Sequence, residues 1–207
     1  MFGIDRFGTL LFFLLLAFLI SGASEAGWPK VVGAGASVAM LVAGFAATGL
    51  IGQRLRMGVL ILIGLSSAVL VSLDASSVAG AVGAFGQAVV LGAILIAVVR
   101  RVLAHDRVGL PTIAGAIAAY VLIGLVFAWI YLALMGVLDG PVLDPEPAGL
   151  PAYYSFEVLT TLGFGDITPA HEFVKRVTAI EAMTGQIFLA TLVARLVSMY
   201  GAPARQE

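Results

Sequence analysis

The stretch that decides the fold is TLGFGD, residues 161–166, which lies between two strongly apolar segments near the end of the chain. Two glycines flank one aromatic residue, with a threonine leading in and an aspartate following. Glycine adopts positive φ at little cost. The hexapeptide therefore suits either a flexible turn or a backbone shaped to contact something, and the surrounding sequence decides between the two.

The composition points to a membrane. Of the 207 residues, 61% are hydrophobic and 11% are charged, whereas soluble domains carry about 25% charged residues. The net charge of −1 gives no sign of a nucleic-acid partner. Cysteine is absent, and His105 and His171 lack the spacing of a histidine metal centre. We therefore expect no cofactor and no metal centre built from cysteine or histidine side chains.

Six apolar stretches come close to the roughly 20 residues that a spanning helix needs. We therefore predict an all-α integral membrane protein with six transmembrane helices. After the first stretch the chain reads SGASEA, so a cleaved signal peptide is the alternative interpretation of that segment. The stretches cover about residues 7–20, 31–51, 57–73, 78–99, 110–137 and 173–200.

The loops between these stretches set the orientation. Arginines concentrate in the loop between the second and third segments and in the loop between the fourth and fifth. Under the positive-inside rule both loops face the cytoplasm. Both termini are then cytoplasmic and TLGFGD lies on the outer side. The basic residues are Arg54, Arg56, Arg100, Arg101 and Arg107.

Two further features belong to the outer side in this orientation. Residues 138–152 read LDGPVLDPEPAGLPA, and their prolines, glycines and acids predict an exposed, turret-like loop. Trp28, Trp129 and Tyr131 are expected near the outer interface, where aromatic belts lie.

Residues 153–161, YYSFEVLTT, predict a helix of about two turns, which is too short to span. Such a helix enters the membrane and stops, and non-helical backbone at membrane depth is tolerated only where protein buries it or it lines a water-filled cavity. We predict a re-entrant loop in which TLGFGD returns to the outer surface. If left- and right-handed conformations alternate, as Gly163 and Gly165 allow, its carbonyls can replace the hydration shell of a cation. One chain has one such loop, so a closed ring needs several copies, most simply four.

The stretch EVLTTLGFGD, residues 157–166, resembles the pore signature of tetrameric potassium channels, T-x-G-[YF]-G-D. The resemblance extends over about residues 110–200 and implies passive, potassium-selective conduction by a homotetramer. It implies K⁺ and membrane lipids as partners and a multi-pass location in the cell (inner) membrane. The chain would divide into a front bundle, residues 1–107, and a pore domain, residues 108–207. The implied filter is Thr161, Leu162, Gly163, Phe164 and Gly165, with K⁺ at the first four.

The same resemblance implies roles for residues beside the filter. Tyr153, Glu157 and Asp166 would support its outer end, with Glu157 either sharing a proton with Asp166 or satisfying backbone amides. Gly185 would be a gating hinge or a close-packing site for the short helix. Glu181 lies one turn earlier, and an acid inside a membrane segment is a functional candidate. It would face the water-filled cavity or bond to the short helix.

The sequence also departs from the family pattern. Phe164 stands where tyrosine is commoner, which removes a hydroxyl that could tie the filter to the short helix. Residues 78–99 contain no arginine, so the fourth segment is not a voltage sensor. Neither departure removes a residue of the filter signature itself.

Three other functions remain to be weighed. A non-selective monovalent cation channel is the main alternative, and a non-conducting membrane scaffold is another. GFGD also matches the GxGD pattern of intramembrane aspartyl proteases, but that chemistry needs two facing carboxylates. The six apolar segments supply no second aspartate. We therefore expect a channel and not an enzyme.

Overall fold

The structure is a computed structural model that describes residues 6–23, 77–104, 109–147 and 151–200. Four long helices coincide with predicted apolar segments: α1 (Arg6–Ala23), α4 (Val78–Leu103), α5 (Leu110–Met135) and α7 (Glu172–Tyr200). A short helix, α6 (Ala152–Leu159), confirms the helix predicted before TLGFGD. The predicted segments 31–51 and 57–73 lie outside the described residues, as do Trp28, Arg54, Arg56, His105 and Arg107.

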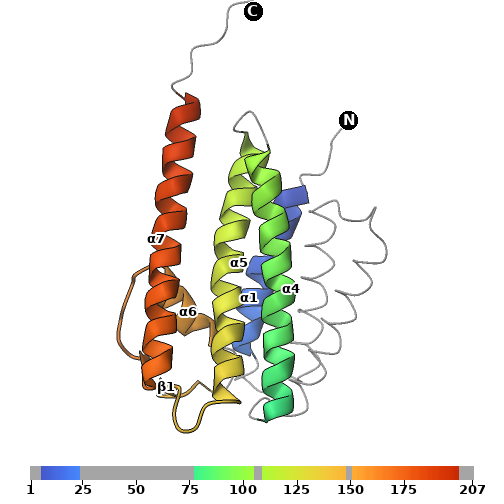
Figure 1. Ribbon diagram of the computed structural model, residues 1–207. Coiled ribbons are helices and arrows are strands. Elements are labelled where there is room, and N and C mark those ends of the chain that lie inside the picture. The colour runs from blue at the N-terminus through green and yellow to red at the C-terminus, as the bar shows by residue number, and fades with distance from the viewer. Residues whose placement is uncertain (1–5, 24–76, 105–108, 148–150, 201–207) are drawn as a thin grey trace, which may run out of the picture.

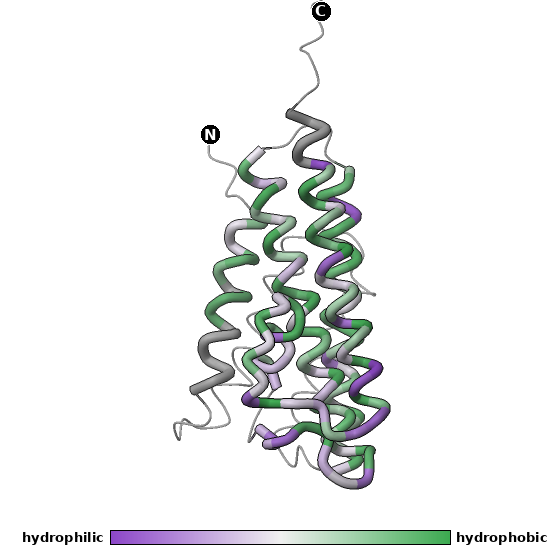
Figure 2. Tube along the Cα trace, turned by 90° about the vertical axis from the view of Figure 1, so that its left-hand side faces the viewer, coloured by the Kyte–Doolittle hydropathy of each residue, from purple (hydrophilic) through white to green (hydrophobic). Residues whose placement is uncertain are grey.

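Three of the described helices are long and apolar enough to cross a membrane. They are α4, α5 and the part of α7 from Glu172 to Arg195. Figure 2 shows their apolar character as long green stretches, with hydrophilic residues gathered toward the lower end of the view. The length and apolarity of these helices fit a membrane protein.

Helix α5 occupies the centre of the described fold (Figure 1). Helices α1 and α4 pack against it, and so do α6 and α7. The starts of α1 and α5 lie at the same end of the bundle as the ends of α4 and α7 (Figure 1). In chain order, the four long described helices therefore alternate in direction (Figure 1).

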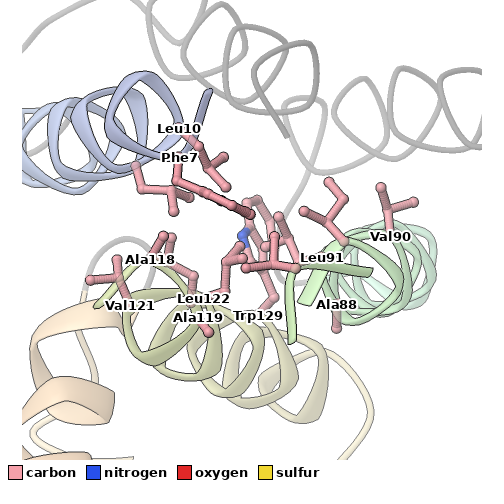
Figure 3. Close-up of a cluster of buried hydrophobic side chains, with 14 of the residues drawn as sticks. Phe7, Leu10, Ala88, Val90, Leu91, Ala118, Ala119, Val121, Leu122 and Trp129 are labelled. Atoms are coloured by element: carbon pink, nitrogen blue, oxygen red, sulfur yellow. The ribbon is translucent and has the colours of Figure 1, made fainter. Parts of the chain in front are cut away.

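The main hydrophobic core lies between α1, α4 and α5 (Figure 3). Leu10, Leu91 and Leu122 are fully buried there, one from each helix. Trp129 is also part of this core, so its ring packs against helices of its own chain and not against lipid headgroups, and its depth near the outer interface stays a prediction. The indole is large and apolar, and facing helices of its own chain bury it more completely than lipid headgroups would.

A second, smaller core lies at the end of the bundle that carries the only strands among the described residues. Strand β1 (Leu143–Asp144) pairs antiparallel with β2 (Thr168–Pro169). The side chains of Val142 and Leu143 are fully buried against α5, α6 and α7. The expectation that residues 138–152 are exposed is therefore wrong for these two, because their apolar side chains anchor the loop. Tyr131 is also fully buried in this core, so it too is surrounded by its own chain, and its depth near the outer interface stays a prediction.

Candidate functional site

Helix α6 lies between α5 and α7, and each wall carries a glycine at the point of contact. A Cβ added to Gly124 of α5 would lie 2.8 Å from Cζ of Phe156. One added to Gly185 of α7 would lie 2.5 Å from the carbonyl oxygen of Leu159. The missing side chains admit the short helix between two long ones. This geometry fits the close-packing interpretation of Gly185, and the gating hinge stays a prediction.

In the extended segment after α6, residues 160–166, positive and negative φ angles alternate. This segment is called the exposed strand below, although it pairs with no other strand among the described residues. Positive φ occurs at Thr161 (57°), Gly163 (60°) and Gly165 (77°), and at neither Leu162 nor Phe164. The left-handed conformations expected at the two glycines are therefore present. The sequence did not indicate the one at Thr161, because a β-branched residue rarely adopts positive φ and the conformation costs on the order of 1–3 kcal/mol.

Hydrogen bonds to α6 hold the start of this strand. The amide of Thr161 donates to the carbonyl oxygen of Val158 at 3.0 Å, and the amide of Leu162 donates to that of Glu157 at 2.9 Å. The Thr161 hydroxyl donates to the carbonyl oxygen of Thr160 at 2.7 Å. Because it donates there, its oxygen keeps lone pairs for another partner.

In the single chain this strand has almost no cover. Residues 160–166 are all exposed, with 56% of Leu162 and 68% of Phe164 accessible. A Cβ at Gly163 or Gly165 would meet nothing within 4 Å. Left- and right-handed conformations that alternate along the backbone are the pattern expected to turn successive carbonyls toward one side, whereas a regular strand alternates them. The site is therefore an exposed segment with alternating φ and two exposed apolar side chains.

The residues expected to support the filter lie close together at its outer end. The amide of Gly165 donates to Oε1 of Glu157 at 3.0 Å, and the Tyr153 hydroxyl donates to Oδ2 of Asp166 at 3.0 Å. No hydrogen bond joins Glu157 to Asp166 directly. Glu157 is buried, and its Oε2 has no hydrogen-bond partner. This geometry matches the amide-satisfying interpretation of Glu157, and the shared proton stays a prediction.

Glu181 lies behind α6, fully buried between α5, α6 and α7. Its Oε2 accepts a hydrogen bond from the Tyr131 hydroxyl at 2.6 Å, and its Oε1 lies 2.5 Å from Oγ of Ser155 on α6. Glu181 therefore faces the short helix and not the exposed side of α7. Sequence reasoning missed Ser155 and Tyr131; a serine inside the apolar run YYSFEVL was the available signal.

Two further hydrogen bonds connect distant parts of the chain near this site. The Tyr120 hydroxyl of α5 donates to the carbonyl oxygen of Leu159, the last residue of α6, at 3.0 Å. Toward the other end of α7, Nη2 of Arg195 donates to the carbonyl oxygen of Leu103, the last residue of α4, at 3.0 Å. In both cases the acceptor is a carbonyl left free at a helix end.

Residues 119–201 match a family model described as an ion channel. This match covers less than half of the chain, and over it the chain is similar to ion channels. The match begins within α5, includes α6 and the exposed strand, and ends just past α7. No curated protein and no solved structure matches the chain significantly. The similarity and the three long apolar helices fit a membrane ion channel, and the division between residues 107 and 108 stays a prediction.

The described part of the chain has no preformed metal site made of side chains. No group of three or more histidine, cysteine, aspartate or glutamate residues that could hold a metal ion occurs in residues 6–23, 77–104, 109–147 and 151–200. The oxygens available to an ion in the exposed strand are those of the backbone and the Thr161 hydroxyl. Such oxygens suit hard cations.

Proposed function

We propose that the chain is one subunit of a homotetrameric, potassium-selective channel that conducts K⁺ passively down its gradient. The observation that carries this proposal is the alternating φ of Thr161, Gly163 and Gly165. It turns consecutive carbonyl oxygens toward one side of an exposed strand. A ring of such strands replaces the water around a desolvated cation with carbonyl dipoles.

In this channel, K⁺ is coordinated by oxygens of Thr161, Leu162, Gly163 and Phe164. The Thr161 hydroxyl adds a ligand at the inner end, where its lone pairs are available. Gly165 permits the last left-handed turn, and Glu157 holds its amide. The chain's own residues thus position backbone oxygens, and no side-chain charge binds the ion. K⁺ is the substrate and not a resident cofactor.

Four copies are the simplest assembly that closes the ring. Two exposed apolar surfaces of the single chain support it: the side chains of Leu162 and Phe164, and the outward face of α7. In the tetramer, neighbouring subunits cover these surfaces. The exposed backbone oxygens then face a shared axis and not lipid, as membrane depth requires.

The proposed topology has six transmembrane helices, with α6 and the filter as a re-entrant loop and both termini cytoplasmic. The start of α1 and the end of α7 lie at the same end of the bundle, which supports this arrangement (Figure 1). The arginine-bearing end of α4 lies there as well, which fits the positive-inside rule. The channel would lie in the cell membrane, with filter and turret loop outside.

The proposal is tested by flux into liposomes with K⁺, Rb⁺ or Na⁺ as the permeant ion. Alanine resists positive φ, so Gly165→Ala is expected to abolish the preference for K⁺ over Na⁺. Gly140→Ala is the matched control, because Gly140 also has positive φ (84°) and open space around its Cα but lies in the outer loop. Unchanged K⁺ preference in Gly165→Ala would remove the filter assignment.

A non-selective monovalent cation channel is the second candidate. Phe164 favours it, because the ring carries no hydroxyl and is 68% accessible in the single chain. This filter then lacks one anchor to α6 and deforms more easily around a smaller ion. The same flux assay separates the candidates: equal Na⁺ and K⁺ flux in the wild type establishes the non-selective channel.

A further inference from the structure

Behind the filter, five contacts between oxygen atoms join α5, α6 and α7 into one polar chain. Ser155 Oγ lies 2.7 Å from the carbonyl oxygen of Gly124 and 2.5 Å from Oε1 of Glu181. The Tyr131 hydroxyl lies 2.6 Å from Oε2 of Glu181 and 3.3 Å from Oγ1 of Thr178. The chain continues to the Tyr154 hydroxyl, 2.7 Å from the same Thr178 oxygen.

Each of these contacts needs one proton, and hydroxyl groups bring only one each. Ser155 has one proton and two oxygens close to it, the carbonyl oxygen of Gly124 at 2.7 Å and Oε1 of Glu181 at 2.5 Å, so an ionised Glu181 leaves one of these two contacts without a proton. The peptide oxygen of Gly124 can only accept. If Ser155 donates to it, the proton between Ser155 and Glu181 has to come from the carboxyl group.

A protonated carboxyl group supplies the missing proton. The Tyr131 hydroxyl donates to Oε2 of Glu181, its nearer acceptor at 2.6 Å, while Thr178 lies farther from it at 3.3 Å. Oε1 then donates to Ser155, which donates to Gly124. Every hydroxyl in this order donates once and accepts at most once, which is within its capacity.

We propose that Glu181 is a neutral carboxylic acid in the folded channel and that, as a donor to Ser155, it positions α6 against α5 and α7. The surroundings of Glu181 agree with a neutral group. No lysine, arginine or histidine of the described residues forms an ion pair with it. An isolated carboxylate with no exposed surface is costly inside protein and lipid, whereas the neutral acid is not.

The role is that of a positioning residue. Glu181 is fully buried and does not reach the exposed strand, but Ser155 lies on the helix whose end leads into Thr161. The acid therefore acts on conduction through the placement of α6. Its amide analogue, glutamine, keeps one donor and one acceptor and should replace it, while an apolar side chain of similar length should not.

The protonation of the Glu181 carboxyl group is tested by infrared difference spectroscopy of the full-length protein in lipid at neutral pH. The spectrum of the wild type minus that of Glu181→Gln should show the C=O band of a protonated carboxylic acid. Glu172→Gln is the matched control on the same helix: Glu172 is exposed and paired with Lys175 at 2.6 Å, so its loss should remove carboxylate bands instead. If Glu181→Gln also removes only carboxylate bands, the proposal is wrong.

A second variant covers the case in which Glu181→Gln does not assemble. Ser155→Ala removes the acceptor of the carboxyl proton and should move the same C=O band. A band that stays at the wild-type position contradicts donation to Ser155. Neither infrared measurement depends on which ion the channel conducts.

The positioning role is tested by K⁺ flux, and this arm rests on the proposed function. Glu181→Gln should keep flux within about twofold of wild type, and Glu181→Met should lower it about tenfold or more, because buried hydroxyls lose their partner. Equal flux in the two variants overturns the positioning role. Absence of flux in the wild type, together with the protonated band, refutes the channel proposal and leaves the proton assignment standing.

Discussion

Helices α5 and α7 are both long enough to span a membrane, but the rest of the chain buries α5 far more completely than α7. In the most apolar 18-residue window of α5, 67% of the residues are buried, compared with 11% in α7. Helix α5 contacts α1, α4, α6 and α7. A single chain therefore folds around α5 and leaves most of α7 uncovered.

The contacts of α7 with its own chain follow one narrow stripe. Val174, Glu181 and Gly185 are buried on this stripe, whereas Ile180 and Ile187 on other faces are 53% and 67% accessible. Apart from Val174 and Phe188, which packs against Tyr120, this stripe offers an acid and a glycine, whereas many large apolar side chains of α7 are exposed. The comparison teaches that α5 determines the fold of the subunit, and that α7 offers its apolar surface to something outside the subunit.

The sharpest test of this comparison removes one large apolar side chain from each helix. Leu122→Ala leaves a cavity in the core of α5 and should destabilise the subunit by about 2 kcal/mol, the lower end for such changes. Ile187→Ala should weaken assembly while leaving the subunit's own melting unchanged. Circular-dichroism melts and native mass spectrometry in detergent separate the two effects. Equal subunit destabilisation by both variants would break the comparison.

The next test adds a methyl group to a glycine in two spanning helices. Gly185→Ala places a Cβ 2.5 Å from the Leu159 carbonyl oxygen, and such overpacking costs about 1–3 kcal/mol. Gly92→Ala in α4 meets nothing within 4 Å and should be neutral or stabilise by up to about 1 kcal/mol through helix propensity. Melting temperatures of the two variants measure this difference. A Gly185→Ala protein as stable as Gly92→Ala would show that α6 does not contact α7 closely.

A smaller effect is expected from the Tyr120 hydroxyl, which links α5 to the end of α6. Tyr120→Phe removes the hydrogen bond to Leu159 at 3.0 Å and should cost about 1 kcal/mol. It keeps the ring contact with Phe188 of α7, whose centroid lies 5.9 Å away. Tyr120→Leu removes both contacts and should therefore cost more. If Tyr120→Phe melts like the wild type, the hydroxyl is not what links α5 to α6.

The smallest effect is expected from voltage. Moving one charge across the membrane is worth about 2.3 kcal/mol per 100 mV, and α4 carries its only charges, Arg100 and Arg101, in its last turn. Open probability should vary only weakly with voltage in single-channel recordings. A steep curve, equivalent to several gating charges per tetramer, would contradict this expectation.

The four long described helices and the short one were predictable because their signal is local. Each long helix is an apolar run, and its limits agree with the sequence estimate to within a few residues. Gly163 and Gly165 were predictable for the same reason, because the residue type itself indicates positive φ. The second and third predicted segments lie outside the described residues, so the prediction of six helices stays a prediction.

The parts that sequence reasoning missed depend on contacts between distant residues. Tyr131 looks like an interface aromatic until α7 brings Glu181 to its hydroxyl, 50 positions away. The loop residue Leu143 looks exposed until β2 pairs with it. Positive φ at Thr161 contradicts the preference of its residue type, and only the hydrogen bonds made by the end of α6 account for it. No local pattern encodes such pairings.

The hydrogen bond between Arg195 and Leu103 has a mechanical consequence. It ties the far end of α7 to the last carbonyl group of α4, and α4 lies in the part of the chain that the family match does not cover. When that end of α7 moves sideways, either α4 travels with it or the bond breaks. If α7 lines the pore of the proposed tetramer, a sideways movement of α4 is therefore transmitted to it through this bond, without any charge crossing the membrane.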